Sequence, residues 1–162
     1  MEGAEKLIQQ AHQLMNEGEY AQALSKFDKV IKADPNNAEA YYGKAEAAVL
    51  VSKVAVEDVI ALYKKAISLD PANPFYYASL GAFAVEAGQF NEAEAAYVKA
   101  AEIDPDTAPY YFSEFAVEYH RRAPEVMEQY LDDSTRALID KKSLKYLLRS
   151  IGLDEEKAKK LL

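Results

Sequence analysis

The sequence has no cysteine and no tryptophan, and only two histidines occur among its 162 residues. Without cysteine the chain can form neither a disulfide framework nor a thiolate metal site. His12 and His120 lie far apart in the sequence, so they do not form a pair with the spacing of a zinc site. A glycine-rich phosphate loop and a nucleophile elbow are also missing from the sequence. We therefore expect no metal, no cofactor and no catalytic residue, and we interpret the protein as a non-enzyme.

Long hydrophobic runs are missing as well, although half of the residues are hydrophobic. No stretch approaches the ~18–20 uncharged apolar residues that a membrane helix needs. The first ten residues, MEGAEKLIQQ, carry acids and glutamines where a signal peptide would have a basic end and an apolar run. We therefore expect a cytoplasmic protein with no membrane partner.

The two signs of charge are unevenly distributed along the chain, whose formal net charge is −8. Residues 141–162 hold seven Lys or Arg against three Asp or Glu, a net +4, which leaves −12 for the rest. A mostly acidic body repels phosphate backbones, so nucleic acid is not expected as a partner. The charge instead predicts a protein or peptide partner that is basic or amphipathic.

The sequence contains an internal repeat. Three segments end in the same way: VIKADP at 30–35, AISLDP at 66–71 and AAEIDP at 100–105. Their final prolines lie 36 and 34 residues apart. Two more segments match in the middle of the repeat, NEGEYAQAL at 16–24 and EAGQFNEAE at 86–94. A period near 34 residues, with two helices in each unit, is typical of helical repeat proteins.

The residues within this period resemble the tetratricopeptide repeat. A large residue of the first helix is followed four positions later by a small one, and the second helix carries a small residue, an aromatic one and a small or branched one. The large residues are Leu7, Tyr41, Tyr77 and Tyr111. The small residues that follow them are Ala11, Ala45 and Gly81, with Phe115 departing from the pattern. The second helices supply Ala23, Phe27 and Val30, then the bulkier Val59 with Tyr63 and Ala66, and then Ala93, Tyr97 and Ala100.

The resemblance implies an all-α fold, a right-handed solenoid of antiparallel helix pairs. Residues 1–105 would form three repeats, at about 4–37, 38–73 with a two-residue insertion, and 74–107. Residues 106–162 would form a degenerate fourth unit and C-terminal capping helices of the same domain. We expect helices near 4–17, 20–33, 37–51, 55–69, 74–87, 90–103, 108–122, 124–138, 141–151 and 154–162.

Local signals place the ends of these helices. Gly18 and Gly88 lie where a helix pair must reverse, and Gly152 lies after the helix expected at 141–151. Each Asp-Pro ends a helix, because the residue before proline is disfavoured in the α region. Asn73 and Thr107 precede prolines of the next first turn and are expected to cap those helices, and Asp154 could cap the last one.

Two departures from the pattern leave alternatives open. The insertion that begins at Ser52 is either a loop that contacts a partner or an ordinary tolerated insertion. The basic cluster at 120–122, His-Arg-Arg, either binds a carboxylate or phosphate or complements the C-terminal end of its helix.

In the tetratricopeptide family, the first helices of successive repeats line a concave surface that takes an extended peptide or a helix. The resemblance carries this groove to the following residues: Ile8, His12, Met15, Glu39, Tyr42, Glu46, Val49, Phe75, Ala78, Ala82, Val85, Phe112 and Tyr119. These side chains are mostly apolar, with glutamates among them, and such a surface fits an amphipathic helix with basic residues. We therefore predict a scaffold for protein–protein interaction.

One branch of the family binds the carboxylate of chaperone tails through lysines, asparagines and an arginine. The corresponding positions here hold Ile8, His12, Gly43, Phe75 and Ser79. None of them supplies the required charge, so a chaperone-tail adaptor is disfavoured.

The C-terminal segment is an amphipathic basic helix. Leu144, Leu147, Leu148 and Ile151 share one helical face, and lysines surround it. This helix caps the last repeat, folds back into its own groove, or enters the groove of a neighbouring copy to give a homo-oligomer. The alternative function is accordingly that of a structural, self-associating protein.

Overall fold

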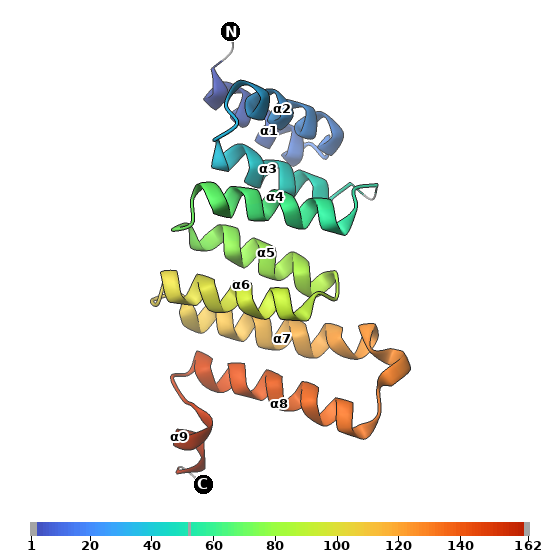
Figure 1. Ribbon diagram of the computed structural model, residues 1–162, viewed down its shortest axis with the longest axis vertical. Helices are drawn as coiled ribbons and strands as arrows, with labels where there is room; N and C mark the ends of the chain where they lie inside the picture. The colour runs from blue at the N-terminus through green and yellow to red at the C-terminus, as the bar shows by residue number, and fades with distance from the viewer. Residues whose placement is uncertain (1–2, 52, 161–162) are drawn as a thin grey trace. The chain divides into compact units, whose positions relative to one another are not determined.

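The computed structural model describes residues 3–51 and 53–160, and the chain divides into two compact units, Met1–Tyr76 and Tyr77–Leu162 (Figure 1). The described residues contain helices and no β-strand. The predicted all-α class, a solenoid of helix pairs, is therefore confirmed. Within the described residues, no helix is both long enough and apolar enough to cross a membrane.

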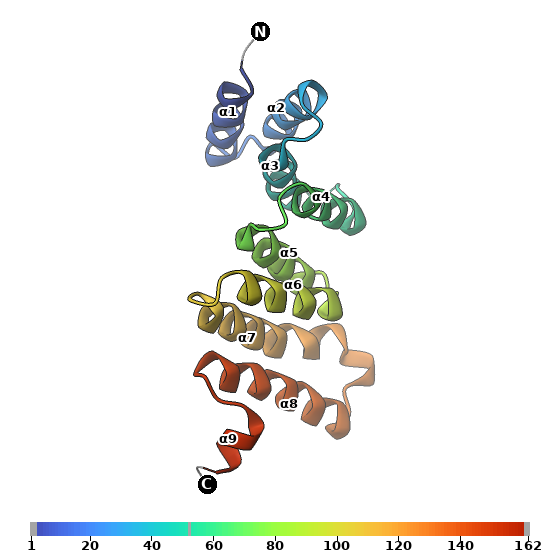
Figure 2. The same cartoon turned by 60° about the vertical axis from the view of Figure 1, so that its left-hand side comes forward.

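The first unit contains two helix pairs. They are α1 (Ala4–Asn16) with α2 (Tyr20–Ala33), and α3 (Ala38–Val49) with α4 (Val56–Leu69). α2 also packs against α3, which joins the pairs (Figure 2). The core of the unit is built from small and aromatic side chains with no exposed surface, among them Ala11, Ala23, Phe27 and Ala40.

The second unit contains most of α5 (Pro74–Glu86), then α6 (Phe90–Ile103), α7 (Ala108–Val126), α8 (Asp133–Ser150) and α9 (Glu155–Lys159). A short 3-10 helix, η1 (Glu128–Tyr130), lies in the connection between α7 and α8. α7 lies between α6 and α8 in both views (Figures 1 and 2). Aromatic rings fill its core, and Tyr97 and Phe115 have no exposed surface.

The second helix of each pair buries residues at positions i, i+4 and i+7, which lie on one face of a helix. These residues are Ala23, Phe27 and Val30 in α2, Val59, Tyr63 and Ala66 in α4, and Ala93, Tyr97 and Ala100 in α6. The sequence analysis gave these same residues as the repeat positions of the second helices. Their burial agrees with the expected pattern.

Two glycines allow close approach of helices. A Cβ at Gly81 would lie 2.7 Å from the ring of Tyr97, which agrees with the small residue that the repeat requires at this position. A Cβ at Gly43 would lie 2.4 Å from the ring of Phe27, although the repeat placed the small residue of this helix at Ala45. The sequence pattern therefore missed the role of Gly43 in the approach of α3 to Phe27 of α2.

Most helix ends agree with the local signals. Gly18, Gly88 and Gly152 adopt positive φ angles of 80°, 75° and 75°, which favour glycine. α2, α4 and α6 each end at the residue before an Asp-Pro. The side chain of Asp154 accepts a hydrogen bond from the Lys157 amide, so the predicted cap of the last helix is confirmed.

The caps that start the helices agree only in part. Asn73 Oδ1 accepts a hydrogen bond from the Phe75 amide at 3.1 Å, as expected. Thr107 does not cap α7 through its side chain, so that prediction is wrong. Asp104 Oδ1 instead accepts from the Thr107 amide at 3.3 Å, which satisfies part of this turn. Ser52, where the insertion of repeat two begins, lies outside the described residues.

The prediction of separate helices at 124–138 and 141–151 is wrong. α7 continues through Pro124 to Val126, and a single helix, α8, begins at Asp133. Pro124 lies in the last turn of α7, where it removes only one intrahelical hydrogen bond. The start of α8 is fixed by Asp132, whose side chain accepts a hydrogen bond from the Thr135 amide at 2.7 Å.

The fourth helix pair keeps the burial spacing of the others. α8 buries Ile139, Ser143 and Tyr146, again at i, i+4 and i+7. Ser143 Oγ donates to the carbonyl of Ala116 at 2.8 Å, so the small residue that faces α8 comes one position after Phe115. The linker explains this shift, because Pro109 follows Asp104 by one residue more than Pro74 follows Asp70. One residue turns a helix by about 100°.

Candidate functional site

Eight of the predicted groove residues lie in the first unit and five in the second. Four of them are buried and offer a partner little surface: Ile8, Val85, Phe112 and Tyr119. The other nine are at least partly exposed: His12, Met15, Glu39, Tyr42, Glu46, Val49, Phe75, Ala78 and Ala82. Most of the accessible set belongs to the first unit, on α1, α3 and the start of α5.

α1 and α3 approach each other through predicted residues. His12 Nε2 lies 3.9 Å from Glu39 Oε1, and both side chains are about half exposed. His12 also has an apolar neighbour. Its ring packs edge-on against the Phe27 ring, with the two centroids 5.6 Å apart. The structure thus holds an imidazole and a carboxylate together at the surface.

Tyrosines extend this surface along α3. Tyr42 stacks on Tyr76 with ring centroids 4.8 Å apart and an angle of 27° between the rings. Tyr42 also contacts Tyr63 of α4 at 6.2 Å. The sequence reasoning missed Tyr76. No feature of the sequence singled it out, because its role depends on the tertiary contact with Tyr42.

The Glu46 carboxylate near these rings accepts a hydrogen bond from a tyrosine hydroxyl. Tyr63 Oη donates to Glu46 Oε1 at 2.7 Å. Burial, and then the neighbouring Glu46 carboxylate, raise the pKa of Tyr63 far above its ordinary value, so the hydroxyl keeps its proton. Burial, followed by Asp70 and Glu39, raises the pKa of Tyr76 as well. The hydroxyls of Tyr63 and Tyr76 therefore stay neutral. Both residues are buried, so the ring that this group offers at the surface is the partly exposed Tyr42, beside the exposed Glu39.

Apolar side chains lie at the ends of this surface. Val49 is 41% exposed and the adjacent Leu50 is 52% exposed, both at the C-terminal end of α3. Phe75, at the start of α5, is 66% exposed. The first unit therefore combines exposed apolar groups with a ring and carboxylate cluster formed by Glu39, Tyr42, Glu46 and Tyr76, which we call the α3 cluster.

In the second unit, α8 covers the predicted groove residues of α7. Tyr146 packs against Phe112 at 5.8 Å, and the Arg149 guanidinium lies 4.1 Å above the Phe112 ring. Lys142 Nζ lies 5.5 Å from the centre of the Tyr119 ring. The longer linker before α7 turns these residues into the core and leaves Val117, which the sequence reasoning missed, 55% exposed.

The basic cluster of α7 has a structural role, although not at the end of its own helix. α7 continues beyond it to Val126. Arg121 pairs with Glu86 and Glu118, and Arg122 Nε donates to the Glu86 carbonyl at 3.1 Å. The arginines thus satisfy and complement the C-terminal end of α5, where the helix dipole is negative.

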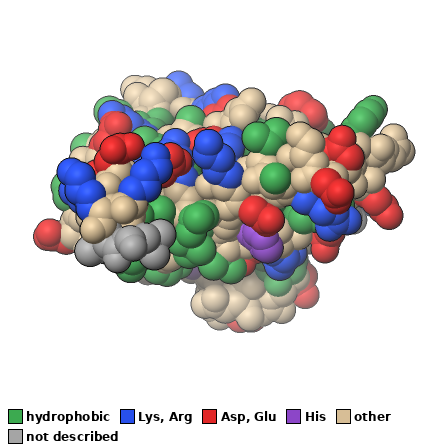
Figure 3. Space-filling view, turned by 90° about the horizontal axis from the view of Figure 1, so that it is seen from below, with side chains coloured by type: hydrophobic (Ala, Val, Ile, Leu, Met, Phe, Trp, Pro, Cys, Tyr) green, Lys and Arg blue, Asp and Glu red, His purple; other side chains and the backbone are tan. Residues whose placement is uncertain are grey.

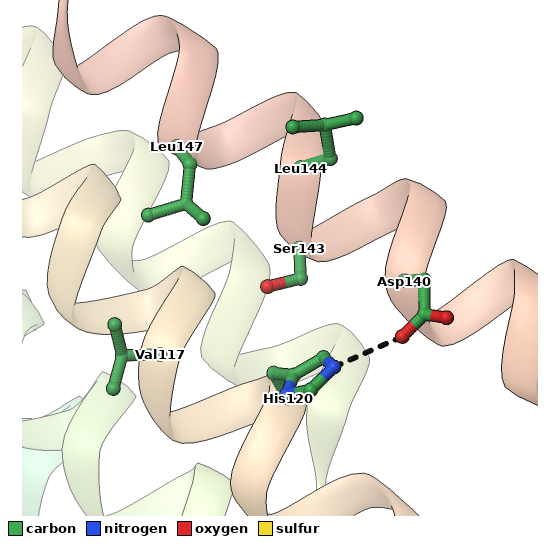
Figure 4. Close-up of a pocket in the computed structure, with 6 residues that line it drawn as sticks. All are labelled: Val117, His120, Asp140, Ser143, Leu144 and Leu147. Atoms are coloured by element: carbon green, nitrogen blue, oxygen red, sulfur yellow. Dashed lines mark hydrogen bonds and ion pairs between the residues drawn. The ribbon is translucent and has the colours of Figure 1, made fainter.

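A shallow hollow lies between α7 and α8 (Figure 4). Its volume is about 280 Å³, and it is lined by Val117, His120, Asp140, Ser143, Leu144 and Leu147. His120 Nε2 and Asp140 Oδ1 are 2.9 Å apart at one side of it. Figure 3 shows hydrophobic side chains beside a histidine on this face.

Within the part of the chain that the structure describes, no three His, Cys, Asp or Glu residues gather in a way that could hold an ion. Carboxylates among these residues form ion pairs or accept hydrogen bonds from tyrosine hydroxyls, side-chain amides and backbone amides.

Two family models match the sequence, and both describe the tetratricopeptide repeat. One matches residues 8–74 and the other residues 62–95, so together they span more than half of the chain. No protein among the curated sequences matches.

Several solved structures have a similar fold. A crystal structure of MamA is 22% identical, with a TM-score of 0.72, and the match covers 97% of this chain and 81% of that one. A MamA fragment from Desulfovibrio magneticus RS-1 is also 22% identical, with a TM-score of 0.69 and coverage of 93% and 75%. YrrB, a tetratricopeptide protein described as having an unusual peptide-binding site, is 19% identical, with a TM-score of 0.62 and coverage of 93% and 77%. At these identities the likeness concerns the fold.

Proposed function

This chain belongs to the tetratricopeptide-repeat family, and we propose that it is a protein-interaction scaffold whose first unit binds an amphipathic peptide with basic residues. The α3 cluster carries the proposal. The partly exposed Tyr42 ring is supported by the buried Tyr76 ring on which it stacks, and Glu39, one turn before Tyr42, has 60% of its side chain exposed. Aromatic faces and carboxylates both attract Lys or Arg side chains.

The apolar half of such a peptide has a counterpart on the same unit. Val49, Leu50 and Phe75 are exposed by 41%, 52% and 66%. Exposed apolar groups beside a polar cluster are typical of surfaces that take an amphipathic helix. The likeness to YrrB, which is described as having a peptide-binding site, supports a peptide as the ligand class.

The test is a titration of the full chain with a labelled peptide, followed by fluorescence polarisation. The basic probe is an alanine-based helix of about 18 residues, about five turns, with leucines along one face and lysines beside them. The double variant Glu39→Gln/Val49→Ser changes two exposed side chains. We expect it to weaken binding by about tenfold or more, as loss of anchoring contacts does. Added salt should also weaken binding, because it screens exposed charges.

Two controls make this result specific. Glu57→Gln removes an exposed carboxylate from α4, outside the α3 cluster, and should leave the affinity unchanged. A probe of the same composition with its leucines scattered around the helix should bind weakly. Equal binding by Glu39→Gln/Val49→Ser and by the original chain would contradict the proposed site.

The self-associating alternative has its own test. The C-terminal helix α8 packs against α7 through Ile139, Ser143 and Tyr146, as the second helix of a pair. Its entry into the groove of a neighbouring copy stays a prediction. Sedimentation equilibrium at rising concentration decides it, since a mass that stays monomeric would remove this function. The absence of catalysis and a cytoplasmic location likewise stay predictions from the sequence.

A further inference from the structure

Two cations are held on one side of α8 by the aromatic rings beside them. The guanidinium carbon of Arg149 lies 4.1 Å from the centre of the Phe112 ring and 5.3 Å from the centre of the Tyr146 ring. Lys145 Nζ lies 5.2 Å from the centre of the same Tyr146 ring. Tyr146 is itself fixed, because its hydroxyl donates to Glu94 Oε1 at 2.6 Å. Since ring faces attract cations, this packing keeps Lys145 and Arg149 in place.

The two cations line a hollow at the junction of α8 and α9. Its volume is about 310 Å³, and its lining consists of Lys145, Arg149, Asp154, Glu155 and Glu156. Within residues 3–51 and 53–160, neither Lys145 nor Arg149 forms an ion pair. Glu94 of α6 does not neutralise them, because its carboxylate already accepts hydrogen bonds from Lys142 and Tyr146.

Two of the three carboxylates at the hollow are engaged elsewhere. Asp154 caps α9 by accepting a hydrogen bond from the Lys157 amide at 2.7 Å, and its Oδ2 lies 3.6 Å from Lys157 Nζ. Glu156 Oε1 lies 3.4 Å from Lys159 Nζ. Among the residues that the structure describes, Glu155 has no ion-pair partner. The hollow therefore sets two cations against one uncommitted carboxylate.

α9 is attached to the rest of the second unit mainly through its linker. None of residues 155–159 is buried, and Ala158 alone is partly buried. Gly152 and Leu153 join α9 to α8, and Gly152 adopts a positive φ of 75°. So short a tether keeps the acidic start of α9 at a high local concentration beside the cations. α9 can nevertheless leave the hollow without exposing a core residue.

We propose that Lys145 and Arg149 form a binding site for an acidic peptide segment of another protein, and that segment 154–156 of this chain occupies the site until that peptide displaces it. A ligand with two neighbouring carboxylates would pair with both cations, whereas α9 offers only Glu155. Arginine binds a carboxylate through two parallel hydrogen bonds, which favours this ligand chemistry. The present occupant is itself a run of acidic residues, so we infer a peptide rather than a small anion.

This site belongs to the second unit and takes a ligand of the opposite charge to the one proposed for the α3 cluster. It lies apart from the hollow between α7 and α8, because the two hollows share no lining residue. Failure of the present proposal would therefore leave peptide binding by the first unit untouched, and the reverse also holds.

The test follows the amide NMR spectrum of the full chain at low ionic strength while hexaglutamate is added. We expect the largest shifts at Lys145 and Arg149, and at Glu155, which the peptide displaces. Glu155→Gln removes the competing charge, so the dissociation constant of hexaglutamate should fall by about two- to fivefold, the range typical of an exposed charge pair. Lys145→Gln should raise this constant by a similar factor.

Two controls make the same changes of net charge elsewhere. Glu57→Gln of α4 and Lys29→Gln of α2 alter exposed side chains of the first unit and should leave the dissociation constant of hexaglutamate unchanged. The proposal is overturned if Glu155→Gln binds hexaglutamate no more tightly than Glu57→Gln does. It is also overturned if hexaglutamate shifts neither Lys145 nor Arg149 in any of these variants.

Two further titrations identify the kind of ligand. Inorganic phosphate, added to the same total charge as hexaglutamate, should leave the amides of Lys145 and Arg149 nearly unshifted. Equal shifts would show a general anion site and overturn the proposal of a peptide. Dilution of the chain alone should also leave these amides in place. If they shift with protein concentration, the acidic segment of a second copy is the ligand and a foreign partner is overturned.

The position of α9 is tested by salt. Raising NaCl from about 10 mM to about 1 M shortens the Debye length from about 30 Å to about 3 Å. We expect the heteronuclear NOE of the Glu155 amide to fall over this range, because α9 leaves the hollow once its attraction to the cations is screened. A NOE that does not depend on salt would show that charge does not hold α9 there, and the competition by segment 154–156 would be overturned.

Discussion

Gly43 faces the ring of Phe27, where the two helix pairs of the first unit meet. A Cβ at this position would lie 2.4 Å from ring carbons, a distance that real Cβ atoms do not show. Phe27 has no exposed surface, so its ring has little room to move. The contact therefore depends on the absence of a side chain.

We predict that Gly43→Ala destabilises the protein by about 1–3 kcal/mol, the range found when a packed core is overfilled. Urea unfolding followed by circular dichroism measures this change. Gly3→Ala is the control, because a Cβ at Gly3 would have no neighbour within 4 Å. If the two variants unfold at the same urea concentration, the close approach of α3 to Phe27 is not as the structure shows.

Glu94 joins α6 to α8 through two hydrogen bonds. Its carboxylate accepts from Lys142 Nζ at 2.7 Å and from Tyr146 Oη at 2.6 Å. Burial acts to raise the pKa of Glu94, but the bonds from Lys142 and Tyr146 outweigh it, and the pKa ends below its ordinary value of 4.5. A carboxylate with a lowered pKa stabilises the folded state above its unfolded pKa, and this contribution is lost as the pH falls through the folded one.

We therefore predict that Glu94→Gln lowers the urea midpoint at pH 7, and that the difference from the original chain shrinks as the pH falls below about 4.5. Unfolding curves at pH 7, 5 and 3 would show the trend. Glu102→Gln, which removes an exposed carboxylate of the same helix, should change the midpoint little at any pH. A Glu94→Gln difference that does not depend on pH would show that the charge is not the source of the stabilisation.

In the second unit, the residue at which a helix starts decides which of its side chains are buried. The linker before α7 is one residue longer than the one before α5, and this places Ala116 and Tyr119 in the core and Val117 at the surface. The start of α8 depends on the Asp132 carboxylate. Its bond from the Thr135 amide is the main reason that the pKa of Asp132 lies below its ordinary value.

We predict that Asp132→Ala frays the first turn of α8 without unfolding the unit. Amide hydrogen exchange should become faster at Thr135, because an orphan donor of the helix start loses its acceptor. Ser134→Ala, one position before Thr135, should leave the exchange rate nearly unchanged. The cap should also weaken in the original chain as the pH falls through the lowered pKa of Asp132, because only the carboxylate form accepts so strongly. Unchanged exchange at Thr135 in Asp132→Ala would contradict this role.

At the scale of the whole molecule, sequence reasoning recovered the repeat and most of the helices. The cause is physical, because core positions at i, i+4 and i+7 and the Asp-Pro stops are local patterns. It failed between 124 and 150, where separate helices at 124–138 and 141–151 were expected and Asp132 was not recognised as a cap. The candidate site was predicted in part. Tyr76 and Val117 could not be found, since the packing of Tyr76 on Tyr42 and the exposure of Val117 depend on how α5 and α7 are turned about their axes.

α1 and α8 carry different kinds of side chain at positions that are equivalent in the repeat. α1 presents Lys6, Gln9 and Gln13 where α3 presents the small residues Ala40, Gly43 and Ala47. α8 presents Leu144 and Leu147 where α6 presents residues in contact with the core. α1 thus has polar residues, and α8 exposed leucines, where the equivalent helices have residues packed in the core. It does not depend on how the two units are arranged.

Peptide binding by the first unit is tested most directly by amide NMR spectra of the full chain, recorded as the basic probe is added. The α3 cluster predicts that the largest shifts occur at His12 of α1, Glu39 and Tyr42 of α3, and Tyr76 of α5, with little change at Leu144. Glu39→Gln/Val49→Ser should remove these shifts at the same probe concentration. If the basic probe shifts only residues of α8, or shifts none, the first unit is not the binding site and the account is wrong on its main point.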